Sequence, residues 1–295
     1  MTTARRPAIG RDGPAQGRVD PWTHVNRVVA RSGTSFLWGM RVLPAERRRA
    51  MHAIYAFCRE VDDIVDEPGE VADKKRALAA WREEIDRLYA GRPEWPTTRA
   101  LLGPVRRFDL PREEFLALID GMEIDAAPSV RMRDLDELLG YCRKVAGSVG
   151  VLSVHAFGVP RHPGPRIAEA LGNALQLTNI LRDLEEDAAM QRLYVPRDML
   201  DRHGVSAASP TVVFVHPGFA RVCEELVTLA RGYYTEASRL LTELGWRKMR
   251  PAVLMMAVYR ETLDRLEERG WQRIGGPIRL TRARRMWLGL QYGFF

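Results

Sequence analysis

The stretch AERRRAMHAIYAFCREVDDIVDE (45–67) decides the fold class of this chain. Its apolar residues recur every three or four positions between Met51 and Val65, which is the period of one face of a helix. Pro44 precedes the stretch at a place where helices commonly begin, and a Pro-Gly pair at 68–69 ends the pattern. The stretch therefore predicts a long helix with one buried side.

Helical patterns of this kind fill most of the remaining chain. We predict further helices at about 70–90, 97–107, 111–125, 134–158, 163–190, 217–245 and 247–270, separated by proline and glycine. The run TVVFV (211–215) has the composition of a strand, but no second such run accompanies it. The sequence therefore predicts an all-α protein, because an isolated strand makes no sheet.

The chain of 295 residues is longer than most single domains, yet helical enzymes of this length can fold around one core. We expect one helical domain over 21–295. Residues 1–20 are rich in glycine, proline and arginine and lack the apolar centre of a signal peptide, so we expect a disordered tail there.

The chain is basic, with a net charge of +7 and a pI near 9.6. Such an excess suits nucleic acid, an anionic lipid surface or a phosphorylated substrate. No zinc-finger spacing, RNA-binding aromatic motif or basic helix beside a heptad repeat accompanies it, so we expect no nucleic-acid partner. The segment RLTRARRMWLGLQYGFF (279–295) mixes arginine with aromatic residues and suits peripheral contact with an anionic membrane. The alternative is a final helix that packs on the core and exposes a basic face.

The three cysteines, Cys58, Cys142 and Cys223, are widely spaced in apolar stretches. This pattern favours free thiols in a reducing cytoplasm over disulfides or a metal site. No apolar run approaches the roughly 18 residues that a membrane span needs. We therefore expect a cytoplasmic protein, with any membrane contact being peripheral and at the inner face.

Two pairs of aspartates with the same spacing carry the chemistry. Asp62 and Asp66 lie in REVDDIVDE, and Asp183 and Asp187 lie in NILRDLEED. Residues four apart share a helix face, so each pair brings two like charges close together. A single pair is ordinarily an exposed acidic face, but two pairs in apolar helices favour a divalent cation. Because the ligands are all oxygen, we expect Mg²⁺, with Mn²⁺ as the alternative, held together with substrate phosphates.

The second pair belongs to a longer polar stripe. Gln176, Asn179, Asp183 and Asp187 follow a 3–4–4 spacing within apolar flanks, which is typical of the wall of a polar cavity. An arginine precedes each acid pair, Arg59 before Asp62 and Arg182 before Asp183. Guanidinium groups suit the oxygens of a diphosphate. The alternative for both arginines is a purely structural ion pair.

At this point the sequence resembles the squalene/phytoene synthase family of head-to-head trans-prenyltransferases. The segments that carry the resemblance are TSFLWGMRVLP (34–44), IYAFCREVDDIVDE (54–67), DGMEIDA (120–126), YCRKVAGSVG (141–150) and QLTNILRDLEEDAAMQRLYVP (176–196). The resemblance implies a single-domain isoprenoid synthase fold. In that fold, helices surround a central cavity with the two aspartate motifs on opposite walls.

The resemblance also implies roles for individual residues. The groups matching metal ligands are Asp62, Asp66, Asn179, Asp183 and Asp187. Those matching diphosphate contacts are Arg59, Arg182, Ser35, Tyr55 and Tyr194, with Gln176 on the polar wall. Those matching the pocket for the prenyl chain and the cation are Phe36, Tyr141, Val145, Ala146, Gly147, Val149 and Gly150. Gly33 departs from the family, because several relatives carry serine there; this weakens one phosphate contact but leaves Ser35.

The implied reaction begins when diphosphate leaves one substrate, stabilised by Mg²⁺ and arginine. The 2,3-double bond of the second substrate attacks the allylic cation, and loss of a proton closes a cyclopropane. Tyr141 is the candidate to stabilise the cation through its ring face. No histidine lies in the motifs, so the proton acceptor is either the released diphosphate or a tyrosine.

Three products are open to this family. The stretch at 32–67 looks most like bacterial members that make presqualene diphosphate for hopanoids, and the chain lacks the C-terminal anchor of eukaryotic squalene synthases. We therefore expect two farnesyl diphosphates as substrates, presqualene diphosphate as product and no use of NADPH. Phytoene from geranylgeranyl diphosphate is the alternative, followed by full conversion to squalene or dehydrosqualene.

A different class of function is an inactive helical relative that serves as an assembly protein. Such a protein should have lost acids of the two motifs, and all four are present. A basic membrane-surface protein without chemistry is a third class, which rests on the C-terminal composition alone.

Overall fold

The computed structural model describes residues 20–32, 39–159, 163–206, 209–245 and 249–272, and single positions at 274, 278, 281, 284 and 287. Of the tail predicted over 1–20, only Asp20 is among them. Ser35, Phe36 and Gly33 also lie outside the described residues, so their predicted roles stay predictions.

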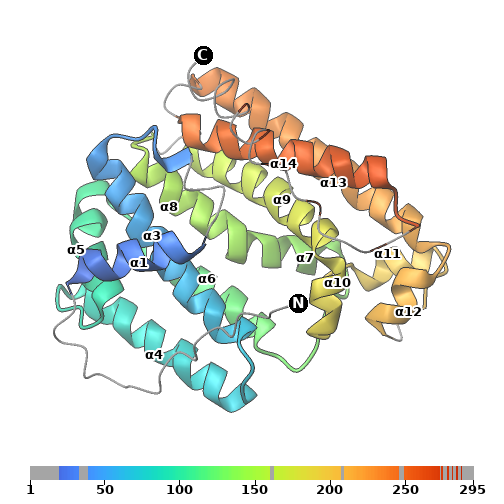
Figure 1. The fold of residues 1–295 in the computed structure, drawn as a ribbon, viewed down its shortest axis with the longest axis horizontal. Coiled ribbons are helices and arrows are strands. Elements are labelled where there is room, and N and C mark those ends of the chain that lie inside the picture. Colours follow the sequence, from blue (N-terminus) through green and yellow to red (C-terminus); the bar gives the residue numbers. More distant parts are fainter. Residues whose placement is uncertain are drawn as a thin grey trace.

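The described chain is built from helices, as the sequence predicts (Figure 1). They are α1 (Pro21–Ser32), α3 (Ala45–Asp66), α4 (Val71–Tyr89), α5 (Pro96–Phe108), α6 (Arg112–Asp125), α7 (Leu135–Cys142), α8 (Ser148–Ala156), α9 (Gly164–Arg182), α10 (Leu184–Ala189), α11 (Arg197–Arg202), α12 (Pro210–Val215), α13 (Phe219–Leu244) and α14 (Arg250–Arg269). A π-helical turn, η1 (Arg143–Gly147), joins α7 to α8. Strands β1 (Val130–Arg131) and β2 (Arg192–Leu193) form one short parallel pair.

Helix α9 lies at the centre of the helical bundle. It packs against α13 and α14 on one side and against α8 and η1 on the other, and Figure 1 shows it between these helices. Helix α3 packs against α5, α6 and α8. The helices carrying the two aspartate motifs are thereby fixed on either side of one interior space.

The apolar stripe of α3 divides between the core and that space. Met51, Ile54 and Val61 are fully buried. Tyr55 and Cys58, which the same pattern predicts as core, are only partly buried and line the cavity. The pattern therefore identifies the inward side of α3 but does not separate packed from cavity-lining positions.

The less regular segments fold as follows. The strand-like run TVVFV (211–215) forms most of a short helix, α12, in agreement with the all-α prediction, and Pro210 stands at its first turn. The predicted helices at 134–158 and 163–190 are each interrupted, the first by η1 and the second at Asp183, whose φ of −103° and ψ of 14° separate α9 from α10. The strand pair β1–β2 was not predicted, because two-residue strands leave no periodicity.

Helices α9 and η1 approach closely at a pair of glycines. A Cβ added to Gly172 would lie 2.9 Å from the backbone nitrogen of Gly147 and 3.0 Å from its Cα. Both neighbours are backbone atoms, which cannot move aside as a side chain can. Gly172 therefore sets the distance between α9 and the π turn.

We predict that Gly172→Ala lowers the free energy of unfolding by about 1–3 kcal/mol, the usual cost of overpacking a core. Chemical denaturation of the purified protein measures this. Gly232→Ala is the matched control, because Gly232 is in α13 and the added Cβ would meet nothing within 4 Å beyond its own helix backbone and chain neighbours. That substitution should stabilise by up to about 1 kcal/mol through helix propensity. Equal effects of the two variants would contradict the close-packing argument.

Candidate active site

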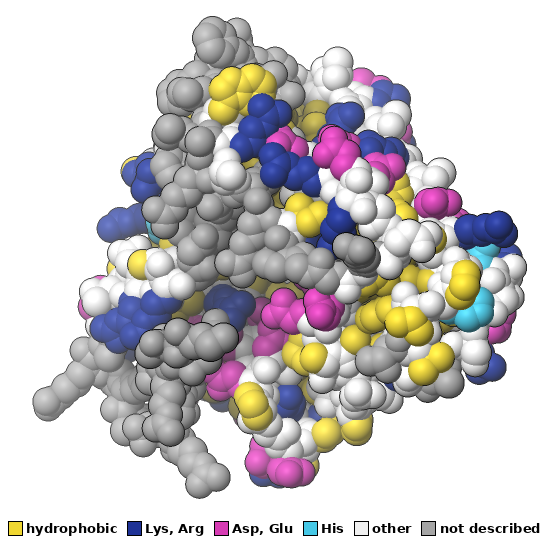
Figure 2. All heavy atoms as spheres, turned by 45° about the vertical axis from the view of Figure 1, so that its right-hand side comes forward, with side chains coloured by type: hydrophobic (Ala, Val, Ile, Leu, Met, Phe, Trp, Pro, Cys, Tyr) yellow, Lys and Arg dark blue, Asp and Glu magenta, His cyan; other side chains and the backbone are white. Residues whose placement is uncertain are grey.

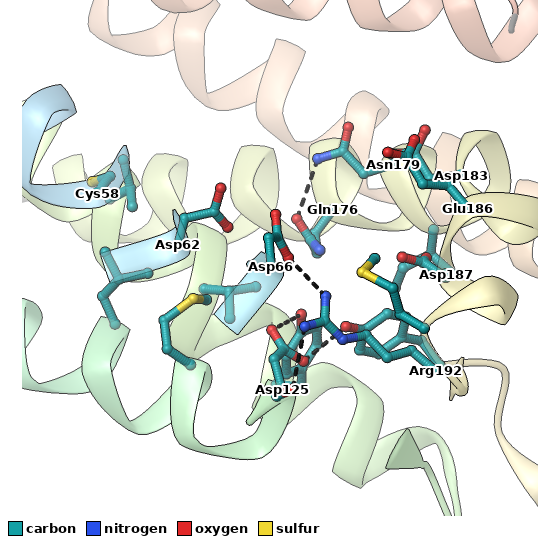
Figure 3. Close-up of a pocket in the computed structure, with 18 of the residues that line it drawn as sticks. Cys58, Asp62, Asp66, Asp125, Gln176, Asn179, Asp183, Glu186, Asp187 and Arg192 are labelled. Carbon is teal, nitrogen blue, oxygen red and sulfur yellow. Dashed lines mark hydrogen bonds and ion pairs between the residues drawn. The ribbon is translucent and has the colours of Figure 1, made fainter. Parts of the chain in front are cut away.

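The interior space between α3, α6, α7–α8, α9 and β2 is a cavity of about 440 Å³ (Figure 3). Its polar lining consists of Tyr55, Arg59, Asp62, Asp66, Asp125, Tyr141, Gln176, Asn179, Arg182, Asp183, Glu186, Asp187, Arg192 and Tyr194. Its remaining lining consists of Cys58, Leu118, Met122, Val145, Val149, Ile180 and Met190. One compartment thus holds both a group of charges and an apolar wall.

The structure brings together most of the residues that the sequence singles out. Figure 3 shows Asp62 and Asp66 on α3 at one side of the cavity, and Asn179, Asp183 and Asp187 at the other. The interruption at Asp183 does not disturb this alignment, because the backbone nitrogen of Asp187 still donates to the carbonyl of Asp183 at 2.8 Å. The 3–4–4 polar stripe is therefore a cavity wall.

Ala146, Gly147 and Gly150 are the exceptions among the described residues, because none of the three lines the cavity. Gly147 lies buried against Gly172 of α9. Its neighbours Tyr141, Val145 and Val149 do line the cavity. The π turn between them holds about one more residue per turn than an α-helix, and the three positions lie on the cavity side. Such turns are frequent at functional sites.

Both arginines of the motifs pair with acids of their own motif. Arg59 binds Asp62 at 3.1 Å and also binds Asp63. Arg182 forms a two-pronged contact with Asp183, from Nε at 2.7 Å and from Nη2 at 2.5 Å. Because both guanidiniums also line the cavity, an ion pair and a role toward a diphosphate are compatible.

A third arginine, which the sequence analysis did not single out, lies at the base of the cavity. The Arg192 side chain is buried and donates to Asp66 Oδ1 at 3.0 Å, to the carbonyl of Val65 at 3.0 Å and to the carbonyl of Asp125 at 3.2 Å (Figure 3). Lys74 donates to the same Val65 carbonyl at 2.7 Å. These two cations offset the acids at the C-terminal end of α3, where the helix dipole is unfavourable for negative charge.

Asp125 is the second residue that sequence reasoning missed. It is 5 % exposed and accepts hydrogen bonds from the hydroxyls of Tyr194 at 2.7 Å and Tyr141 at 2.9 Å. The signal for both missed residues lay within the quoted segments, since DGMEIDA contains Asp125 and QRLYVP contains Arg192. Periodicity did not reveal them, because Arg192 follows a turn with positive φ at Gln191 and belongs to a strand.

Burial and like charges hold several cavity carboxyls toward the protonated form. Burial, and then the charge of Asp66, raise the pKa of Asp62 to about 7. Burial, and then Asp183, raise the pKa of Asp187 to about 8. Both carboxyls therefore lack sufficient positive charge around them in this structure.

These donors fit a hard divalent cation. The carbonyl oxygen of Asn179 is buried without a hydrogen-bond partner, and the carboxyls of Asp62 and Asp187 are under-compensated. Among the residues that the structure describes, no three acidic, histidine or cysteine side chains meet at one point to hold an ion by themselves. Oxygen donors such as these suit Mg²⁺, which takes one or two carboxylates and completes its shell with water and substrate phosphates.

Known proteins resemble this chain over most of its length. The model of the squalene/phytoene synthase family matches residues 29–286. The chain belongs to this family. The resemblance stated from the motifs is thereby confirmed, and with it the all-α fold of the family.

Individual members of the squalene/phytoene synthase family are similar to this chain over most of its length. The chain is 39 % identical over 264 residues to presqualene diphosphate synthase of Sinorhizobium fredii, covering 90 % of this chain and 94 % of the relative. It is 36 % identical over 256 residues to phytoene synthase of Thermus thermophilus, covering 86 % of each. The crystal structure of squalene synthase HpnC from Alicyclobacillus acidocaldarius superposes with a TM-score of 0.78 at 29 % identity, covering 86 % of this chain and 95 % of that one.

Two further expectations concern the surroundings of the site. All three cysteines are free thiols, and burial raises the pKa of Cys58 and of Cys142 to about 12. None of the described helices combines the length and apolar character that a membrane crossing requires. On the face drawn in Figure 2, basic, acidic and hydrophobic side chains of the described residues are intermixed.

We predict that the metal-free protein loses stability as pH rises from about 5 to about 8.5. Asp62 and Asp187 have pKa values raised from 3.8 to about 7 and about 8 in the folded chain, so the folded state binds more protons than the unfolded state over this range. Stability then falls with increasing pH. Denaturation in a chelator at both pH values measures the slope.

The variants Asp62→Asn and Asp187→Asn should flatten this pH dependence, because asparagine stays neutral. Asp201→Asn is the control, since Asp201 is 60 % exposed on α11, away from the cavity, and it should keep the slope. An unchanged slope in both cavity variants would contradict the raised pKa values.

Proposed function

We propose that this chain is a Mg²⁺-dependent prenyltransferase that joins two farnesyl diphosphates head to head into presqualene diphosphate and releases diphosphate. The observation that carries the proposal is the pair of aspartate motifs on opposite sides of one cavity that also has an apolar wall. A substrate with a charged diphosphate and an apolar chain needs both surfaces in one compartment.

Each part of the cavity has a task in this reaction. Asp62, Asp66, Asn179, Asp183 and Asp187 would hold Mg²⁺, with Mn²⁺ as a substitute. The bound ion would neutralise charge on the leaving diphosphate. Arg59 and Arg182 lie beside the acids, where they can bind the diphosphate oxygens that the ion leaves uncovered.

The apolar wall would exclude water from the cation that remains. Leu118 and Met122 on α6 face this part of the cavity, together with Val145, Val149 and Ile180. The aliphatic side chains of Leu118, Val145, Val149 and Ile180 carry no nucleophilic atom, so the double bond of the second substrate would supply the electrons there. The ring of Tyr141 stands among them and can stabilise positive charge.

The choice of farnesyl diphosphate rests on relatives. The presqualene diphosphate synthases of Sinorhizobium fredii, Rhodopseudomonas palustris and Zymomonas mobilis are each 39 % identical to this chain, and the phytoene synthase of Thermus thermophilus is 36 % identical. We propose farnesyl diphosphate on this basis, with release of the product before any reduction by NADPH.

Two parts of the proposal concern the whole chain. We place 21–295 in one catalytic domain that acts in the cytoplasm. Peripheral membrane contact through 279–295 stays a prediction, supported by Trp287, which is 48 % exposed, and by Arg284 over its ring at 4.3 Å from the centroid. The ion pair of Arg284 with Glu261 at 2.8 Å ties this position to α14.

We predict that the purified protein with Mg²⁺ converts farnesyl diphosphate to presqualene diphosphate and that the product persists when NADPH is added. Mass spectrometry of the extracted products measures this. Conversion to squalene would correct the product, and turnover of geranylgeranyl diphosphate alone would contradict the choice of substrate.

A second prediction tests the aspartate motifs. Asp62→Asn and Asp183→Asn should each lower kcat by at least about 100-fold, because each removes a negative ligand from the ion that stabilises the leaving group. Asp201→Asn makes the same chemical change on an exposed helix position and should leave kcat unchanged. Near-normal turnover by either motif variant, with normal helical circular dichroism, would refute the metal roles.

A further inference from the structure

A closed hydrogen-bonded group of two tyrosines and one carboxylate lies at the base of the cavity. Tyr141 donates to Asp125 Oδ2 at 2.9 Å, and Tyr194 donates to Asp125 Oδ1 at 2.7 Å. The two rings are stacked, with centroids 4.8 Å apart and an angle of 22° between their planes. All three residues line the cavity, although each is at most 5 % exposed.

The Asp125 carboxylate keeps its ability to take up a proton. Among the described residues, no cation forms a salt bridge with it, because Arg192 binds the backbone carbonyl of Asp125 and not its carboxylate. Burial raises the pKa of Asp125 to about 6, against the opposing effect of the Tyr194 hydrogen bond. Each carboxylate oxygen accepts a hydrogen bond from a tyrosine hydroxyl, so a proton from the cavity would reach the carboxylate through a tyrosine.

Of the two tyrosines, Tyr141 is the one beside the apolar wall. It precedes Val145 and Val149 on the same side of the α7–η1–α8 segment, and all three line the cavity. Tyr194 instead follows β2, two residues after Arg192, on the charged side. A prenyl cation on the apolar wall would therefore meet the hydroxyl of Tyr141.

We infer that Asp125 is the final acceptor of the proton lost on cyclopropane closure, and that it receives this proton through the hydroxyl of Tyr141. The inference rests on the proposed function. A C–H bond of the cationic intermediate breaks, and its electron pair forms the last C–C bond of the ring. The Tyr141 oxygen takes the proton while its own hydroxyl proton moves to Asp125 Oδ2, which leaves a neutral carboxyl and a neutral tyrosine.

Tyr194 is the positioning residue in this arrangement. Its hydrogen bond to Oδ1 fixes the rotation of the carboxylate, so that Oδ2 points at Tyr141. Arg192 contributes by fixing the backbone of Asp125 against Val65 of α3. Asp125 is thus held in place at both its side chain and its main chain.

The test compares Asp125→Asn and Tyr141→Phe with the wild type under farnesyl diphosphate and Mg²⁺. Both variants should lower the rate of presqualene diphosphate formation by about 100-fold or more, the usual contribution of a general base. The KM for farnesyl diphosphate should stay within about threefold, because neither group binds the diphosphate. Diphosphate should still be released, and the ratio of farnesol and other allylic alcohols to presqualene diphosphate should rise as water captures the cation.

Tyr234→Phe is the matched control. Tyr234 is a buried tyrosine whose hydroxyl bonds Thr178 at 2.8 Å, and it does not line the cavity. Its loss removes the same oxygen atom without touching the relay, so the product ratio should stay at the wild-type value. Asp125→Glu, which keeps the carboxylate, should restore part of the rate lost in Asp125→Asn.

Two results would overturn the inference. Wild-type rates in Asp125→Asn would show that another group, such as the released diphosphate, takes the proton. Parallel loss of diphosphate release and of presqualene diphosphate, with an unchanged product ratio, would show a purely structural role. Should Asp125→Asn not fold, Tyr141→Phe decides between the same outcomes. Failure of the proposed function is separate, because the wild type would then form no presqualene diphosphate.

Discussion

The carboxylates around one cavity repel one another, and the fold depends on the positive groups that offset this repulsion. Asp62, Asp66, Asp125, Asp183, Glu186 and Asp187 all line the cavity, with the guanidiniums of Arg59, Arg182 and Arg192 among them. Like charges at this spacing destabilise a folded chain unless cations offset them. The excess of acids over arginines means that the folded chain alone leaves negative charge uncompensated, and the divalent cation that we propose would offset it.

Arg192 connects the charged groups of the cavity to the backbone of the surrounding helices. It connects the end of α3 to the end of α6 by binding the carbonyls of Val65 and Asp125. Its own place is set by the β1–β2 pair and by the turn at Gln191, whose φ of 59° is uncommon for a residue other than glycine. A buried arginine with several acceptors is held in one geometry, so it can fix the carboxylate of Asp66.

The apolar half of the cavity depends on a different constraint, which is close packing. The π turn η1 is pressed against α9 at Gly147 and Gly172, where any side chain at Gly172 would meet backbone. This contact fixes the line of Tyr141, Val145 and Val149 on the cavity side. The same helix, α9, carries Gln176 and Asn179 and ends at Asp183, so the apolar wall and part of the charged wall share one rigid support.

The sequence by itself determined the helical class, the two aspartate pairs and the polar stripe of Gln176 and Asn179, because helix periodicity places residues three and four apart on one face. It also determined the family, through motifs whose spacing is specific. Only the tertiary structure decided which long-range partners meet. Arg192 and Asp66 are 126 positions apart, and Asp125 and Tyr194 are 69 apart. It also decided that Gly147 packs and does not line the cavity. No local period encodes such contacts, because they arise only when separate helices come together around a shared space.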